Sequence, residues 1–178
     1  RQRQMCIRDR WRRNCGVVMQ EGYIFSDSLE CNIGVVDEIP DMEKVQNAVK
    51  TANIGDYVEG LPLRYNTKIG ADGQGLSTGQ KQRLLIARAV YKDPAYIFFD
   101  EATNSLDANN EKTIMDNMKL FFNRTVVVVA HRLSTVKNAD TIVVLEKGKI
   151  VEQGNHTELI AHKGAYFNLV KDQLELGN

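Results

Sequence analysis

The sequence predicts an α/β fold in which a parallel sheet is joined by a helical subdomain. Two apolar stretches of strand length, residues 95–99 and 125–130, each stop at a polar side chain, which is typical of central strands covered on both faces. Ahead of the first stretch, residues 84–90 repeat apolar side chains at helical spacing. A chain of 178 residues is long enough for one domain with a sizeable core. Ligand-binding side chains are expected at the carboxyl ends of such strands.

Residues 75–80 form a small-residue loop that leads into the helical stretch. Ser77 is a good N-cap residue, because its hydroxyl can accept a hydrogen bond from a backbone N–H one turn later. Gly79 lets the backbone approach a ligand closely. The free N–H groups and the dipole of a helix start favour an anion such as phosphate. An ordinary capped helix after a loop explains this stretch equally well.

Asp100 and Glu101 directly follow the apolar stretch at residues 95–99. A hard cation such as Mg²⁺ takes oxygen ligands like the Asp100 carboxylate. A second carboxylate nearby can accept a proton from water. Considered without the rest of the chain, the pair is better explained as two solvated acids at a helix start.

Taken together, these stretches are far more specific. Residues 76–80, followed by an apolar strand that ends at Asp100, resemble the ATP-binding cassette of ABC transporters, and the resemblance covers residues 12–178. It implies a P-loop NTPase-like parallel sheet, with residues 96–100 as the Walker B strand. The residues implied to contact ATP belong to the signature loop and the D-loop: Ser77, Thr78, Gly79, Gln80 and Asp107. Thr78 stands where the signature usually has glycine, and its β-branch is expected to be tolerated.

The resemblance also assigns the chemistry. Glu101 matches the carboxylate that polarises the attacking water, and Asp100 matches the Walker B metal ligand. His131, which follows residues 125–130, matches the switch histidine that contacts the γ-phosphate. Gln20 matches the Q-loop glutamine, which reaches the metal and the attacking water. The implied cofactors are therefore ATP and Mg²⁺.

The family also implies the order of the strands. Residues 16–20 form a short apolar stretch that ends in a polar residue and is predicted as the Q-loop strand. We expect residues 16–20, 96–100 and 125–130 to pair in parallel in that order. The strand that carries the P-loop should lie beside residues 125–130, so we expect an exposed edge there.

A helical insertion is predicted between the Q-loop and the signature loop, over residues 28–75. Asp41 can cap a helix within it, and Gly55 can end that helix. Residues 61–75 carry turn chemistry and are predicted as a loop. In the family, this insertion is the helical subdomain that carries the signature loop.

The C-terminal stretch is predicted as a hairpin, residues 141–145 with 149–152, followed by two short helices around Gly164 within residues 156–174. The predicted division of the chain is residues 1–11 unassigned, 12–27 the Q-loop part of the ATPase core, 28–94 the helical subdomain with the signature loop, and 95–178 the C-terminal part of the core.

Composition excludes several classes of protein. The 23 basic and 23 acidic side chains balance, so there is no global attraction to nucleic acid or to an anionic membrane. Cys6, Cys15 and Cys31 lack ligand spacing, which argues against a zinc site or a disulfide framework and fits a reducing cytosol. Residues 1–10 are basic without periodicity and resemble a cloning or sequencing artefact, with a basic arm for lipid or nucleic acid as the alternative.

The P-loop pattern G-x-x-x-x-G-K-[ST] should precede the Q-loop and is absent from this sequence. A helix N-terminus contributes about 0.3–1 kcal/mol to anion binding and ~2 kcal/mol at best. A millimolar dissociation constant needs about 4 kcal/mol. We therefore expect a C-terminal fragment of a longer protein that lacks the N-terminal part of the core and is inactive by itself.

The predicted function is part of the ATP-hydrolysing domain of an ABC exporter, which couples ATP binding and hydrolysis to transport across a membrane. Residues 130–136 and 147–159 look like exporter cassettes, including peptide exporters of bacteria. The implied partners are a second nucleotide-binding domain, in a homo- or heterodimer, and a transmembrane domain fused upstream, with no nucleic acid. The implied location is the cytoplasmic face of the membrane, within an integral membrane transporter. The alternatives are a non-transport ABC-type ATPase of DNA maintenance or translation, and a non-catalytic module that completes a partner's ATP site.

Overall fold

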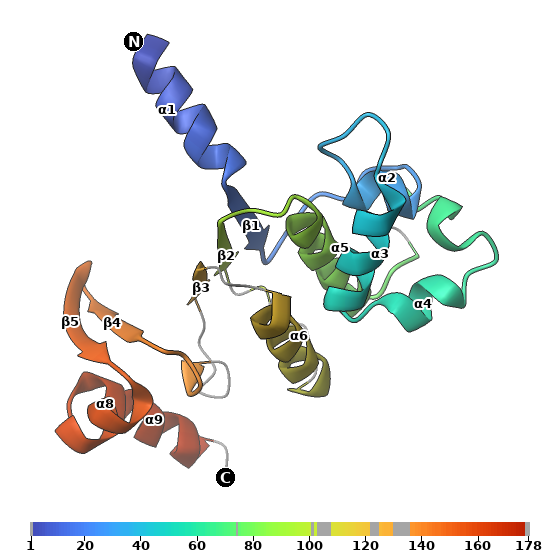
Figure 1. The fold of residues 1–178 in the computed structure, drawn as a ribbon. Helices are drawn as coiled ribbons and strands as arrows, with labels where there is room; N and C mark the ends of the chain where they lie inside the picture. The colour runs from blue at the N-terminus through green and yellow to red at the C-terminus, as the bar shows by residue number, and fades with distance from the viewer. Residues whose placement is uncertain are drawn as a thin grey trace. The chain divides into compact units, whose positions relative to one another are not determined.

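The computed structural model describes residues 2–73, 75–100, 102, 108–121, 125–129 and 136–176. The chain divides into two compact units, Arg1–Val129 and Ala130–Asn178 (Figure 1). The elements of the first unit are α1 (Gln2–Arg13), β1 (Cys15–Met19), α2 (Leu29–Ile33), α3 (Met42–Thr51), α4 (Gly55–Glu59), the 3₁₀ helices η1 (Arg64–Asn66) and η2 (Ala71–Gly73), α5 (Thr78–Tyr91), β2 (Tyr96–Asp100), α6 (Ala108–Phe121) and β3 (Thr125–Val129). The elements of the second unit are β4 (Ile142–Glu146), β5 (Lys149–Gly154), α8 (His156–His162) and α9 (Ala165–Leu176).

The first unit contains a parallel sheet whose described strands follow the order β1–β2–β3. Met19 at the end of β1 is opposite Asp100 at the end of β2, and Asp100 is opposite Val129 at the end of β3. All three strands therefore end at the same edge of the sheet. The predicted order and parallel pairing are confirmed, and β3 forms one edge of the described sheet, as expected.

The sequence predicted strands covered on both faces, but buried and exposed side chains alternate along the strands of the structure. Ile97 and Phe99 of β2 are buried, whereas Met19 and Val129, on the opposite face, remain 57% and 52% exposed. Successive side chains of a strand point to opposite faces. Helices α5 and α6 contribute to the buried cluster that contains Ile97 and Phe99, so they cover only one face. We call the other side, with Val17, Met19, Val127 and Val129, the open face.

Helix α5 is the centre of the helical part, where it lies with α2 and α3 (Figure 1). Ser77 caps it through its hydroxyl, which accepts a hydrogen bond from the N–H of Gln80. Leu84 and Ile86 are completely buried in the main core. The helix ends before Asp93, which takes a left-handed φ of 52°, and Pro94 follows. The predicted cap is confirmed.

Helix α3 begins as predicted but ends earlier. Asp41 caps it by accepting from the N–H groups of Glu43 and Lys44. The predicted stop at Gly55 is wrong, because Ala52 is the C-cap and Asn53 takes a left-handed φ of 51°. Asparagine tolerates this conformation better than other non-glycine residues. Gly55 instead begins α4.

Two further segments contain helices that the sequence did not predict. Residues 61–75, predicted as a loop, contain η1 and η2. The N-terminal segment, which the sequence left unassigned, forms α1, with Ile7 and Trp11 exposed by 68% and 52%. The Trp11 ring lies 5.1 Å from that of Tyr96. In the described part of the chain, no helix combines the length and the apolar character that crossing a membrane requires.

The second unit is the predicted hairpin with two helices. Strands β4 and β5 pair antiparallel, and Lys147 and Gly148 at the turn both have positive φ, as a tight hairpin turn requires. Helices α8 and α9 flank Gly164. A small core holds this unit together: Ile142, Val144, Leu159, Tyr166 and Val170.

A carboxylate from β5 anchors the start of α9. Glu152 accepts hydrogen bonds from the backbone N–H groups of Ala165, at 3.0 Å, and Tyr166, at 2.8 Å. The bond from Tyr166 is the main reason that the pKa of Glu152 lies below its ordinary value of 4.5. A Cβ on Gly164 would overlap Oε1 of Glu152, so only glycine leaves room for this carboxylate.

Candidate functional site

The carboxyl edge of the sheet brings two predicted metal ligands together. Asp100 is the last residue of β2, and Gln20 directly follows Met19, the register partner of Asp100. Adjacent strands lie about 4.8 Å apart, so these side chains start from neighbouring strand ends. Both are exposed, and both offer oxygen atoms, which suit Mg²⁺. Among the described residues there is no group of three His, Cys, Asp or Glu side chains suited to a metal.

Three predicted site residues, Glu101, Asp107 and His131, lie outside the described residues. Residues close to two of them in sequence lie at the carboxyl edge of the sheet. Glu101 follows Asp100 directly, and the chain leaves β3 at Val129, two positions before His131. Their predicted roles therefore stay predictions.

The signature loop begins α5 with a reciprocal cap. The N–H of Ser77 donates to Oε1 of Gln80 at 2.8 Å, while the N–H of Gln80 donates to the Ser77 hydroxyl at 3.2 Å. The Gln80 side chain is thus directed back to its own helix. In the described part of the chain, no protein acceptor is recorded for the N–H groups of Thr78 and Gly79. These are the groups that a helix start offers to an anion.

Arg83 ties the signature loop to the helix that follows the D-loop. Its Nε donates to the carbonyl of Gly79 at 3.3 Å, and its Nη1 donates to the carbonyl of Asn53 at 2.7 Å. The Asn53 amide in turn donates to Oδ1 of Asn110 in the first turn of α6, at 2.8 Å. This polar chain connects the signature loop, which the sequence predicted as an ATP contact, to the helix that follows the predicted D-loop.

Two polar side chains of α5 that the sequence analysis missed contact the Q-loop. Gln82 is buried and donates to the carbonyl of Met19 at 3.2 Å. Arg88 donates to the carbonyls of Tyr23 and Asn32, both at 2.7 Å, and burial lowers its pKa. The only signal in the sequence was an arginine inside an otherwise apolar helical stretch.

An exposed aromatic pair follows the Q-loop. Tyr23 and Phe25 are 58% and 43% exposed, and their rings meet edge to face with centroids 5.1 Å apart. Further exposed apolar side chains come from the connection between α2 and α3 and from the start of α3: Val35, Val36, Ile39 and Met42.

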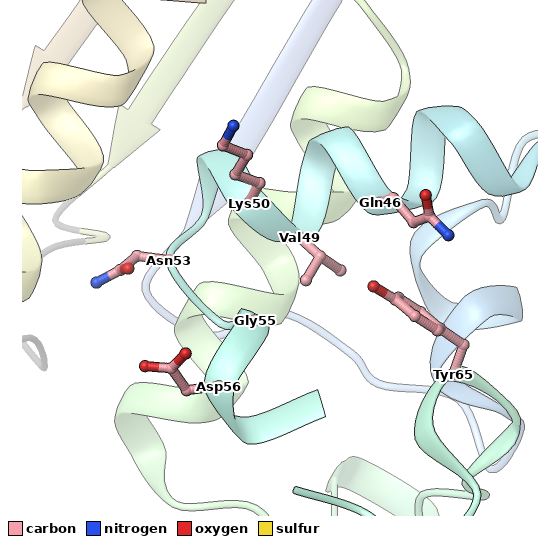
Figure 2. Close-up of a pocket in the computed structure, with 7 residues that line it drawn as sticks. All are labelled: Gln46, Val49, Lys50, Asn53, Gly55, Asp56 and Tyr65. Atoms are coloured by element: carbon pink, nitrogen blue, oxygen red, sulfur yellow. The ribbon is translucent and has the colours of Figure 1, made fainter. Parts of the chain in front are cut away.

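A pocket of about 240 Å³ lies elsewhere, against α3 (Figure 2). Its lining comes from α3, from the connection to α4, from the start of α4 and from η1: Gln46, Val49, Lys50, Asn53, Gly55, Asp56 and Tyr65. None of the predicted site residues lines it. The chemistry predicted from the sequence therefore belongs to the sheet edge and the signature loop, and not to this pocket.

Comparison with known proteins gives one consistent family. The family model described as "ABC transporter" matches residues 2–104, which run from the first residue of α1 to four residues past the end of β2. A solved structure described as that of a bacterial Atm1-family ABC exporter with ATP bound matches with a TM-score of 0.87 and 39% identity. The match covers 91% of this chain and 28% of that chain.

Curated relatives agree. The "Toxin RTX-III translocation ATP-binding protein" of Actinobacillus pleuropneumoniae is 48% identical over 160 residues, 89% of this chain and 22% of that protein. The "Leukotoxin export ATP-binding protein LtxB" of Aggregatibacter actinomycetemcomitans is 49% identical over 157 residues, 87% of this chain and 22% of that protein. The chain thus spans less than a quarter of the length of these relatives.

Proposed function

The chain belongs to the ABC transporter family, and on that premise we propose that it is part of the ATP-hydrolysing domain of an exporter. The observation that carries this proposal is the register of β1 against β2, which pairs Met19, the residue before Gln20, with Asp100 at the carboxyl edge of the sheet. The capped signature loop adds a second set of phosphate-binding groups. The relatives' names speak of toxin translocation and leukotoxin export, which favours a peptide or toxin as the transported substrate.

The proposed chemistry is hydrolysis of Mg-ATP. The Asp100 carboxylate and the Gln20 amide oxygen would hold Mg²⁺, and their exposed oxygen donors fit that ion. Bound Mg²⁺ would supply charge neutralisation at the phosphates. Glu101 would accept the proton of the attacking water, and His131 would contact the γ-phosphate.

The signature loop would act on ATP held by a second nucleotide-binding domain. Its helix start contributes ~2 kcal/mol at best to anion binding, so most of the affinity has to come from a P-loop. Ser77, Thr78, Gly79, Gln80 and Asp107 would complete the partner domain's site, in a homo- or heterodimer. A fused transmembrane domain would place the assembly at the cytoplasmic face of the membrane, and the exposed Tyr23 and Phe25 are suited to contact it.

The decisive experiment compares two substitutions in the complete exporter that contains this chain. Glu101→Gln keeps the shape of the side chain but cannot accept the proton, so hydrolysis should fall at least about a hundredfold while ATP still binds. Asp100→Asn should also raise the Mg²⁺ requirement, because a charged ligand is lost. Asp41→Asn is the matched control, since asparagine also caps a helix well. Hydrolysis by Glu101→Gln near the parent rate would refute the assigned mechanism.

A second candidate is a module that completes a partner's ATP site without hydrolysing ATP itself, and a complete reading frame without a P-loop pattern would favour it. In either case the isolated 178-residue chain should bind Mg-ATP with a dissociation constant no lower than about millimolar. A single helix start contributes ~2 kcal/mol at best, whereas millimolar binding needs about 4 kcal/mol. A micromolar constant in calorimetry would mean that other residues of this chain hold the phosphates. A P-loop in the complete reading frame would argue against the second candidate.

A further inference from the structure

One face of α5 holds the loop that carries Gln20. We propose that Gln82 and Arg88 are positioning residues that fix Gln20 relative to the signature loop, a role that rests on the proposed function. Gln82, Leu85 and Arg88 follow one another at a spacing of three residues, so they lie along one side of the helix. Each of them contacts the backbone between Met19 and Tyr23, and we call the three side chains the α5 clamp.

The first contact of the clamp comes immediately before Gln20. The Gln82 side chain is only 3% exposed, and its amide donates to the carbonyl of Met19 at 3.2 Å. A buried amide left without an acceptor loses free energy. The bond therefore restrains the end of β1 at the residue that precedes the proposed metal ligand.

The second contact is steric. Gly22 lies so close to α5 that a Cβ built on it would be 2.6 Å from Cδ1 and 2.7 Å from Cδ2 of Leu85. The loop backbone is thus pressed against the helix between its two polar contacts.

The third contact is the strongest, because it uses a charged donor. Nη1 of Arg88 donates to the carbonyl of Tyr23 at 2.7 Å, and its Nε donates to the carbonyl of Asn32 at the same distance. The guanidinium also lies 5.3 Å from the centre of the Phe25 ring. Within the described residues no carboxylate forms an ion pair with Arg88. Its guanidinium donates instead to neutral acceptors of the loop and of α2.

Asn32 secures the far end of the same loop. Its side chain is completely buried, and its Oδ1 accepts from the N–H of Phe25 at 2.9 Å and from Arg88 at 3.1 Å. Its amide donates to the carbonyls of Phe25 and Ser28, both at 3.0 Å. The loop is therefore bound on both sides of Gln20, while the Gln20 side chain remains exposed.

This arrangement makes α5 a rigid link. Ser77 begins the helix, and the clamp holds residues 19–25 along its length, so the signature loop, Gln20 and the exposed pair Tyr23 and Phe25 should move as one body.

Hydrogen exchange of single backbone amides in the 178-residue chain tests the clamp without any ATPase activity. Arg88→Met keeps the apolar stem but removes the donors, and Gln82→Met does the same at the other end. We expect the amides of Phe25 and Asp27, which donate to Oδ1 of Asn32 and to the carbonyl of Phe25, to exchange at least about tenfold faster in Arg88→Met. Arg83→Met is the matched control, because it removes a guanidinium from the same helix whose bonds go to Gly79 and Asn53.

The proposal is overturned if Arg88→Met leaves these amides within about twofold of the parent, or if Arg83→Met accelerates them equally. Should Arg88→Met fail to fold, Gln82→Met and Arg88→Lys carry the same test. Lysine can reach one carbonyl but has no fork, so it should give an intermediate rate. Equal exchange in the parent and in both of these variants would refute the clamp.

A second readout separates positioning from mere stability. In the complete exporter, Arg88→Met and Gln82→Met should raise the Mg²⁺ concentration for half-maximal hydrolysis at least about threefold, with partial rescue by Arg88→Lys. Arg64→Met should cause no change, because the Arg64 guanidinium pairs with Glu59 instead. An unchanged Mg²⁺ requirement in both variants would contradict the proposal. If the parent exporter hydrolyses no ATP, the proposed function fails, and the exchange experiment still decides whether the clamp exists.

Discussion

Replacing Ser77 separates a structural role from a ligand-binding role at one atom. Its hydroxyl accepts from the N–H of Gln80 at 3.2 Å and so caps α5. Ser77→Ala removes that acceptor. Ser77→Asp keeps an acceptor, because aspartate is as good an N-cap as serine, but it places a negative charge where the proposed mechanism needs a phosphate. The two variants should therefore differ in stability, and Ser77→Asp should lose activity although its helix cap is kept.

The magnitude follows from the cap. Losing a serine N-cap costs about 0.5–2 kcal/mol, typically ~1, and ~1 kcal/mol changes an opening equilibrium about fivefold. Amides of residues 84–87, in the buried part of α5, should then exchange about fivefold faster in Ser77→Ala and at the parent rate in Ser77→Asp. Asp41→Ala is the matched control, because it removes the cap of α3 instead.

The functional half of the experiment uses the complete exporter. Ser77→Asp should reduce ATP hydrolysis at least about tenfold, because like charges repel within the closed site, whereas Asp41→Ala should leave hydrolysis intact. Two results would refute the reasoning. If Ser77→Asp loosens α5 as much as Ser77→Ala, the cap is not what holds the helix start. If Ser77→Asp hydrolyses ATP like the parent, no phosphate approaches this residue.

Further predictions concern the turns and the second unit. Gly164→Ala should destabilise the second unit in thermal unfolding, because its Cβ would overlap Oε1 of Glu152, while Gly55→Ala, whose Cβ would meet nothing nearer than 4.0 Å, should be tolerated. The lowered pKa of Glu152 means that the unfolded chain binds a proton more readily. Its contribution to stability is therefore present above about pH 4.5 and lost as the pH falls through the folded pKa, and denaturation curves of Glu152→Gln should lack this part of the acid dependence. Asn53→Ala should lower the free energy of unfolding by about 1–2 kcal/mol, because alanine adopts the left-handed conformation of this position less readily than asparagine. Asn53→Gly should lose only the bond to Asn110, because glycine adopts this conformation freely.

Features coded by neighbouring residues were predictable from the sequence. The apolar stretch before Asp100 gave the position of β2, and the serine before α5 gave its start, because strand burial and helix capping depend on residues close in the chain. The meeting of Gln20 and Asp100 followed once the strands were predicted to be parallel neighbours. That inference needed the family's strand order as well as the periodicity.

Features that depend on distant backbone atoms were not predictable. Arg88 binds carbonyls of Tyr23 and Asn32 that are 65 and 56 positions away, and nothing in the local pattern names such partners. The end of α3 was misplaced for a related reason, because Asn53 adopts a conformation for which glycine is the usual residue. Burial on one face of the sheet depended on which helices pack there, and that is a property of the tertiary structure.

In the described part of the sheet, the open face and the β3 edge are both uncovered, so the first unit could serve as one half of a fragment-complementation pair. A separately expressed N-terminal piece that supplies the P-loop strand could add to the β3 edge through backbone hydrogen bonds. It would also cover Val127 and Val129, which are 41% and 52% exposed. The present chain would not hold ATP tightly without that piece. ATP hydrolysis in such a mixture would report the docking of the two halves, and its dependence on concentration would measure their affinity.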